Sequence, residues 1–104
     1  MTDKPEVIVT VLYRRKEGLI LDMDYYLGHH IPLTNSIWGK EGMTSCTVCD
    51  VGEDSEFALK VVLMWKNMAS WEGAQAAEAT KQISADYKNF TNGEFIVIVG
   101  KIIN

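Results

Sequence analysis

Residues 22–33, Asp22-Met-Asp-Tyr-Tyr-Leu-Gly-His-His-Ile-Pro-Leu33, decide how the rest of this chain can be arranged. We expect an amphipathic helix here that extends from Asp22 to about Trp38 and carries the functional site. Asp22 can cap this helix, because a short carboxylate accepts one of the free N–H groups of the first turn. The following side chains recur at the i, i+3, i+4 spacing of one helix face. The residues on this predicted face are Met23, Leu27, His30, Thr34 and Trp38.

Two adjacent histidines and a proline make this helix unusual. His29 and His30 are rotated by about 100° from each other around a helix axis, so only one of them can point straight into the core. His30 lies on the predicted face, and we therefore expect His30 to point inward and His29 to lie at the surface. Pro32 lacks an N–H and its ring crowds the carbonyl of residue 28, so a kink one turn long is expected beside the histidines.

The remaining segments alternate between strand-like and helix-like patterns. Runs rich in β-branched residues predict strands at 7–13, 44–51, 57–65 and 94–103. Gly39 is predicted to follow the first helix as its C′ residue, and Ser70 to cap a second, alanine-rich helix. The order β-α-β-β-α-β predicts an α+β, ferredoxin-like fold, in which two helices cover one face of a four-stranded antiparallel sheet.

The predicted strands are apolar on both faces, although only two helices are available to cover them. Strand 94–103 shows this most clearly, with Phe95, Val97 and Val99 on one face and Ile96, Ile98 and Ile102 on the other. A large exposed apolar face usually marks an interface. We therefore expect a two-fold homodimer that is closed through the sheet face without helices.

Length, charge and composition restrict the classes of protein to consider. The 104 residues are expected to form a single domain, residues 1–104. The net charge is −4 and no basic stretch is longer than Arg14-Arg15-Lys16, so nucleic acid is not an expected partner. We find no signal peptide, and no apolar run approaches the roughly 20 residues of a membrane span. A cytoplasmic protein with neither a membrane nor a nucleic-acid partner is expected.

Cys46 and Cys49 form a Cys-x-x-Cys pattern, but both fall in a predicted strand. Side chains three residues apart in a strand point to opposite faces, so these thiols can neither form a disulfide with each other nor share a metal ion. We predict two free, buried cysteines and no metal site. No glycine-rich nucleotide-binding loop is present, so no nucleotide, flavin or nicotinamide cofactor is expected.

His30 is the first candidate for chemistry, because histidine titrates near neutral pH and can act as a general acid or base. The alternative is a core histidine hydrogen-bonded to a backbone carbonyl, and the sequence leaves both possibilities open. Aromatic side chains could form the walls of an apolar ligand pocket or belong to the core. Asn92 could lie at a pocket mouth or belong to an Asn-Gly turn. The candidate substrate-binding residues are Tyr13, Tyr26, Trp38, Trp65, Phe90 and Asn92.

Several segments together resemble the EthD family, named for a protein of ethyl tert-butyl ether degradation. The resemblance covers nearly the whole chain, and its most specific part is residues 22–27 followed by His30-Ile-Pro-Leu33. Other matching segments are Leu12-Tyr13, Lys16-Glu-Gly18, Ala85-Asp86 and Asn89-Phe-Thr-Asn92, with Phe90 where tyrosine is common. The resemblance implies a dimeric α+β barrel of ferredoxin-like protomers, with a pocket between sheet and helices into which His30 points.

The same resemblance leads to two hypotheses about function. Fungal relatives look like cofactor-free enzymes of polyketide pathways, including decarboxylases, and related barrel families include monooxygenases and cyclases. The first hypothesis is therefore a cofactor-independent lyase or oxidoreductase, in which His30 shuttles a proton on a small apolar, aromatic or polyketide-like substrate. Tyr13, Tyr26 and Asn92 would orient a carbonyl or phenol of that substrate. The second hypothesis is a non-catalytic accessory protein of an oxidative degradation pathway that binds such a molecule.

Overall fold

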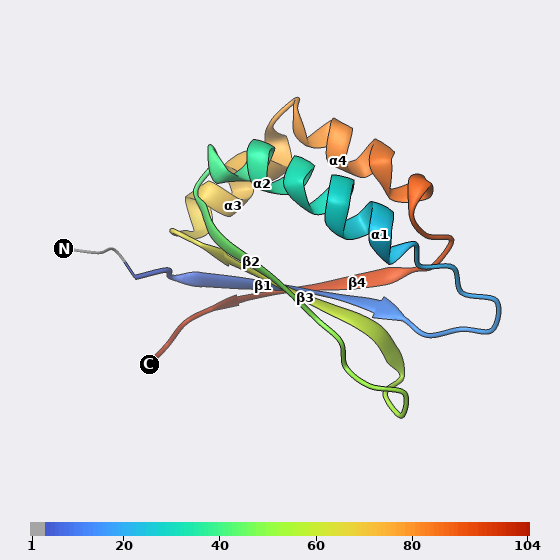
Figure 1. Cartoon of the computed structure of the whole chain (residues 1–104). Coiled ribbons are helices and arrows are strands. Elements are labelled where there is room, and N and C mark those ends of the chain that lie inside the picture. The colour runs from blue at the N-terminus through green and yellow to red at the C-terminus, as the bar shows by residue number, and fades with distance from the viewer. Residues whose placement is uncertain (1–3) are drawn as a thin grey trace.

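The computed structural model describes residues 4–104 as one four-stranded antiparallel sheet with its helices on one face (Figure 1). The strands are β1 (Val7–Arg14), β2 (Met43–Cys49), β3 (Phe57–Trp65) and β4 (Phe95–Lys101), in the sheet order β2-β3-β1-β4. The helices are α1 (Met23–Tyr25), α2 (Ile31–Gly39), α3 (Met68–Ala76) and α4 (Thr80–Asp86), with a π-helical turn at Tyr26–His30 and a 3-10 turn at Tyr87–Asn89. The predicted α+β, ferredoxin-like fold is confirmed. Within residues 4–104, no helix is both long and apolar enough to cross a membrane.

The hydrophobic core lies between the sheet and the helix layer. The central strand β1 pairs with both β3 and β4, so its alternating side chains determine which residues share a face. Val7, Val9 and Tyr13 are buried on the helix side, and so are the residues opposite them on β3. β-branched and aromatic side chains pack well on such a half-covered surface, which is why these segments form strands.

The helix layer leaves the outer strand β4 largely uncovered. Phe95, Val97 and Val99 lie opposite Tyr13, Val11 and Val9 on β1, and therefore face the helix side. These three residues nevertheless remain 44%, 43% and 40% exposed. The space between sheet and helices is therefore open toward β4.

The kink predicted beside the histidines is a π-helical turn. Asp22 caps the helix as predicted, accepting the N–H of Tyr25 at 3.1 Å. The N–H of Ile31 donates to the carbonyl of Tyr26, five residues earlier, which widens the turn. As a result Tyr26 is buried, whereas Leu27 is 51% exposed, and the prediction that Leu27 faces the core was wrong. The buried face comprises Tyr26, His30, Thr34 and Trp38, because the extra residue in the π turn moves the regular spacing by one position.

The predicted second helix is divided into two, α3 and α4. Asn67 caps α3 instead of Ser70, because the side-chain oxygen of Asn67 accepts both the N–H and the hydroxyl of Ser70, at 2.8 and 2.9 Å. The backbone of Ala77 is extended and ends α3. The hydroxyl of Thr80 donates to the carbonyl of Ala74 at 2.5 Å. This side chain takes the place of the backbone N–H that would donate to the same carbonyl in a continuous α-helix. High alanine content predicted one continuous helix because alanine favours helix at each of these positions.

The two edge strands differ slightly from the prediction. β2 and β4 are each shorter than expected, since a strand at the edge of a sheet has a neighbour on one side only. Cys46 pairs with Leu63 and Cys49 pairs with Lys60, so the two thiols lie on opposite faces of β2 and are free, as predicted. Both are half-buried instead of buried, because an edge strand is less covered than a central one.

Gly42, and not Gly39, reverses the chain after α2. Gly39 is the last residue of α2, whereas Gly42 has a φ of +114°. The carbonyl of Gly42 accepts the N–H of Lys66 at 2.9 Å, which joins this turn to the end of β3. The prediction for Gly39 was wrong because the helix continues through this residue and the left-handed conformation comes three residues later.

Gly42→Ala should lower the free energy of unfolding by about 1–3 kcal/mol, because a side chain at this positive φ is strained. Its Cβ would also lie 2.6 Å from the Cβ of Ser70. Gly39→Ala is the matched control, since no atom lies within 4 Å of its Cβ. The control should be neutral or stabilising by up to about 1 kcal/mol. Urea denaturation of both variants is the measurement, and equal destabilisation of the two would contradict this account.

Candidate active site

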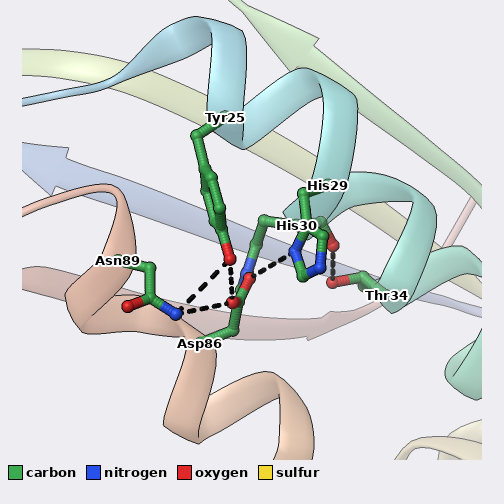
Figure 2. Close-up of polar contacts among 6 residues, drawn as sticks. All are labelled: Tyr25, His29, His30, Thr34, Asp86 and Asn89. Carbon is green, nitrogen blue, oxygen red and sulfur yellow. Dashed lines mark hydrogen bonds and ion pairs between the residues drawn. The ribbon is translucent and has the colours of Figure 1, made fainter.

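A buried carboxylate at the end of α4 organises the polar part of the structure. Asp86 is only 6% exposed, and side chains from α1, the π-helical turn and the 3-10 turn all donate to it (Figure 2). Tyr25 donates to its Oδ1 at 2.5 Å, and the Nδ2 of Asn89 donates to the same oxygen at 3.0 Å. A buried charge is tolerated when its acceptor positions are filled in this way.

The π-helical turn brings both histidines to the other oxygen of this carboxylate. Nδ1 of His30 lies 3.0 Å from Oδ2 of Asp86, and Nδ1 of His29 lies 3.3 Å from the same atom. A π turn has more residues than an α turn, so adjacent side chains diverge less around the axis and can reach one acceptor. The ring of His30 is 9% exposed and that of His29 is 57% exposed. His30 therefore points inward and His29 lies at the surface, as the helix pattern predicted.

Burial and hydrogen bonding set the charges of this cluster. Burial alone would raise the pKa of Asp86, but the hydrogen bonds from Tyr25, Asn89 and the two histidines outweigh it and hold that pKa well below its usual range. Burial lowers the pKa of His30, and Asp86 offsets this effect only in part. At neutral pH Asp86 is therefore ionised and His30 is neutral. An ionised carboxylate only accepts, so the proton of His30 is assigned to Nδ1, and Nε2 carries a lone pair.

A cavity of about 300 Å³ lies between the sheet and the helices, and its wall includes His30, Tyr13, Tyr26 and Trp38. Because Asp86 occupies Nδ1 of His30, Nε2 is the ring nitrogen left for a molecule in this cavity. Burial raises the pKa of Tyr13 to about 12 and also raises the pKa of Tyr26. Both phenols therefore stay protonated at neutral pH.

Two other predicted binding residues, Trp65 and Phe90, lie behind the cavity wall. Trp65 is fully buried, and its ring centroid lies 5.5 Å from that of Trp38. Phe90 is 1% exposed, and its ring centroid lies 4.5 Å from that of His30. Phe90 thus packs against the imidazole of His30, and Trp65 packs against Trp38, which forms part of the wall.

Asn92 also lies outside the cavity wall, where it holds the loop that precedes α1. Its side-chain oxygen accepts the N–H of Ile20 at 2.8 Å, and its Nδ2 donates to the carbonyl of Gly18 at 3.1 Å. The backbone carbonyl of Asn92 accepts a hydrogen bond from Nζ of Lys16 at 3.0 Å. These contacts join two loops that are 72 and 74 residues apart in the sequence, so Asn92 belongs neither to the cavity wall nor to a local Asn-Gly turn.

Asp86, Tyr25 and Asn89 were not among the site residues predicted from the sequence. Asp86 lies 56 residues after His30, so no helical or strand spacing connects the two. The available signal was that Asp86 and Asn89 belong to the segments that resemble the EthD family, and that their three-residue separation places them on one helix face. Tyr25 likewise belongs to the most specific matching segment.

Comparison with solved structures finds proteins of the same fold. An EthD-like protein from Ralstonia eutropha JMP134 matches with a TM-score of 0.83 and 20% sequence identity, over 97% of this chain and 95% of its own. An ethyl tert-butyl ether degradation (EthD) family protein from Bacillus halodurans C-125 matches with a TM-score of 0.72 and 23% identity, over 94% and 99% of the two chains. The chain has the fold of the EthD-like proteins.

A third structure with this fold is SnoaB from Streptomyces nogalater, a cofactor-independent oxygenase. It matches with a TM-score of 0.67 and 10% identity, over 96% of this chain and 97% of its own. No family model and no curated protein matches the sequence. Because one fold hosts many activities, this likeness in fold does not by itself assign a function to the chain.

The buried cluster predicts that stability decreases in two stages as the pH falls. The pKa of His30 is lower in the folded chain than in the unfolded chain, so below about pH 6.5 the unfolded chain takes up this proton first and becomes favoured. Below about pH 4 the unfolded chain also protonates Asp86, which the folded chain keeps ionised. Urea unfolding across this pH range is the measurement. The His30→Gln variant should lose the decrease in stability that begins below about pH 6.5 and keep the decrease below about pH 4. If the decrease below about pH 6.5 persists in this variant, a group other than His30 causes it.

Proposed function

We propose that this protein is a cofactor-independent enzyme of the EthD family that moves a proton on a small apolar, aromatic or polyketide-like substrate. The observation that carries this proposal is the position of His30, which is bound to Asp86 through one ring nitrogen and offers the other to an apolar cavity. A neutral imidazole backed by a carboxylate is a well-positioned general base. The likeness in fold to a cofactor-independent oxygenase supports chemistry without a cofactor.

In the proposed reaction, Nε2 of His30 removes a proton from a carbon or a phenol of the bound substrate. The imidazolium that forms is stabilised by the negative charge of Asp86, 3.0 Å from Nδ1. Tyr13 and Tyr26 donate hydrogen bonds to the enolate or phenolate oxygen on which the negative charge develops. His30 then returns the proton as a general acid. Lyase, cyclase and monooxygenase reactions on such substrates share this proton transfer.

His30→Gln should slow the exchange of the α-protons of 1-tetralone in D2O by about 10²–10⁴-fold, because a positioned acid/base group contributes that much to rate. Proton NMR of this neutral aromatic ketone follows the exchange directly. Ser36→Ala, at an exposed position on α2, is the control and should exchange as fast as the unmodified protein. Equal exchange rates in His30→Gln and the unmodified protein would refute the role of His30.

A second candidate function, binding without turnover, is favoured by the other groups in the cavity wall. Tyr13, Tyr26, Cys46 and Tyr87 line the cavity, and burial raises the pKa of each. Among the lining residues in the described part of the chain, His30 is therefore the one whose pKa suits proton exchange near neutral pH. A protein that only holds a hydrophobic intermediate needs no second acid or base. The exchange experiment separates the two functions, because binding of 1-tetralone without any exchange by the unmodified protein would favour the accessory role.

We also propose a homodimer that is closed through the sheet face opposite the helices. Within the part of the chain that the structure describes, no helix covers this face, which lies below the sheet in Figure 1. The strand register places several apolar side chains together there, and Ile98 is 53% exposed. These residues are Ile8, Leu12, Val62, Met64, Ile96 and Ile98. A face of four strands can supply the roughly 800 Å² per partner of a standard interface.

Light scattering should therefore give twice the protomer mass of 11.7 kDa. Ile98→Asp places a charge within the proposed interface and should shift the mass toward that of one protomer. Val97→Asp is the matched control, because Val97 is the neighbouring residue on the same strand and faces the helix side. A monomeric unmodified protein, or equal masses for the two variants, would contradict the proposed interface.

A further inference from the structure

We infer that the cavity is built for an uncharged ligand and discriminates against carboxylates and other anions. This inference rests on the proposed function and deepens it, because it names the charge class of the substrate. Among residues 4–104, the side chains that line the cavity include no lysine, arginine, aspartate or glutamate. An anionic ligand would therefore find no permanent positive charge in the wall.

Two negative charges, those of Asp86 and Glu94, act on residues that line the cavity. Asp86 lies next to His30, with Oδ2 3.0 Å from Nδ1, and its four hydrogen-bond donors keep it ionised despite its burial. At Tyr87, another part of the wall, burial raises the pKa of the phenol and the negative charge of Glu94 raises it further. Both carboxylates would repel an anion in the cavity, and the net charge of −4 acts in the same direction.

The polar groups of the wall can serve a neutral ligand but cannot compensate a buried charge. Tyr13 and Tyr26 offer phenol hydrogens, which suit a carbonyl or hydroxyl oxygen. The free energy needed to bury an unpaired carboxylate is much larger than that needed to bury a hydrogen-bonded ketone, ester or phenol. The cavity therefore favours molecules that carry oxygen atoms without a net charge.

A neutral substrate also keeps the proposed reaction electrically balanced. When the substrate C–H or O–H bond breaks, its electron pair stays on the substrate as an enolate or phenolate, and the proton forms a new bond to Nε2 of His30. The two new charges appear together as an ion pair, so no isolated charge is left in the apolar cavity. A substrate that arrives as a carboxylate would lack this compensation, which favours ketones, phenols and esters over aromatic carboxylates as substrates.

The test compares methyl 2-naphthoate with 2-naphthoate at neutral pH, two probes that share one ring system and differ in charge. Both are titrated into the unmodified protein, and the quenching of tryptophan fluorescence is followed, because Trp38 and Trp71 line the cavity. The ester should bind at least about tenfold more tightly, given the cost of burying an unpaired charge. Equal or tighter binding of the carboxylate would overturn the inference.

Two variants at one position make the test specific for charge. Gln75 lines the cavity and is exposed on α3, so substitutions there should leave the fold intact. Gln75→Lys should reduce the preference for the ester at least severalfold by adding a positive charge to the wall. Gln75→Met has a similar length without charge and should retain the preference. An unchanged preference in Gln75→Lys would overturn the electrostatic cause.

The naphthoate and 1-tetralone experiments together distinguish failure of this inference from failure of the proposed catalytic function. Preferential binding of the ester without any exchange of 1-tetralone would support an uncharged ligand and refute catalysis. Exchange of 1-tetralone that depends on His30, together with equal binding of the two naphthoate probes, would support catalysis and overturn the inference. Absence of binding by both probes would overturn the inference, because the cavity would then not accept an aromatic molecule of either charge.

Discussion

The rest of the site depends on the hydrogen bonds that the buried carboxylate of Asp86 accepts. It joins the end of α4 to α1 and to the π-helical turn, which are far apart in the sequence. A hydrogen bond to a charged group contributes about 1.5–3 kcal/mol, and a buried charge without partners is strongly destabilising. The four donors therefore stabilise the ionised form, and the ionised form in turn determines the tautomer of His30. The same contacts therefore position the helices and determine which nitrogen of His30 carries the proton.

The cavity exists because two groups of aromatic side chains separate the helix layer from the sheet. One group surrounds Tyr13, whose ring lies 5.7–6.4 Å from those of its aromatic neighbours on β4, the π-helical turn and the segment after α4. The other group contains three tryptophans from α2, β3 and α3, with ring centroids 5.3–6.0 Å apart. Smaller side chains, including Val11 and Thr34, line the space that remains. Large rigid rings at both ends prevent the helices from packing down onto these smaller residues.

Much of the fold could be predicted because its signals are local. Alternating β-branched residues identify the strands, and the cap at Asp22 and the inward direction of His30 follow from helix spacing. Local signals failed where a competing local contact intervened. The π turn moved Leu27 to the surface, and the side-chain oxygen of Asn67 accepts the N–H of Ser70, so that α3 begins before Ser70. In each case the prediction assumed a regular local pattern, and one hydrogen bond altered that pattern.

The sequence by itself determined the order of the elements, which strand residues share a sheet face, and the place of an irregular turn beside two histidines. These properties depend on neighbouring residues, through period, capping and the missing N–H of Pro32. Only the tertiary structure decided that Asp86 serves as the partner of His30, and that Trp65 and Phe90 support the cavity from behind. The reason is physical, since α4 meets the π-helical turn only after both pack on the same sheet face. No spacing along the chain encodes which carboxylate, of fourteen acidic residues, is then buried beside the imidazole.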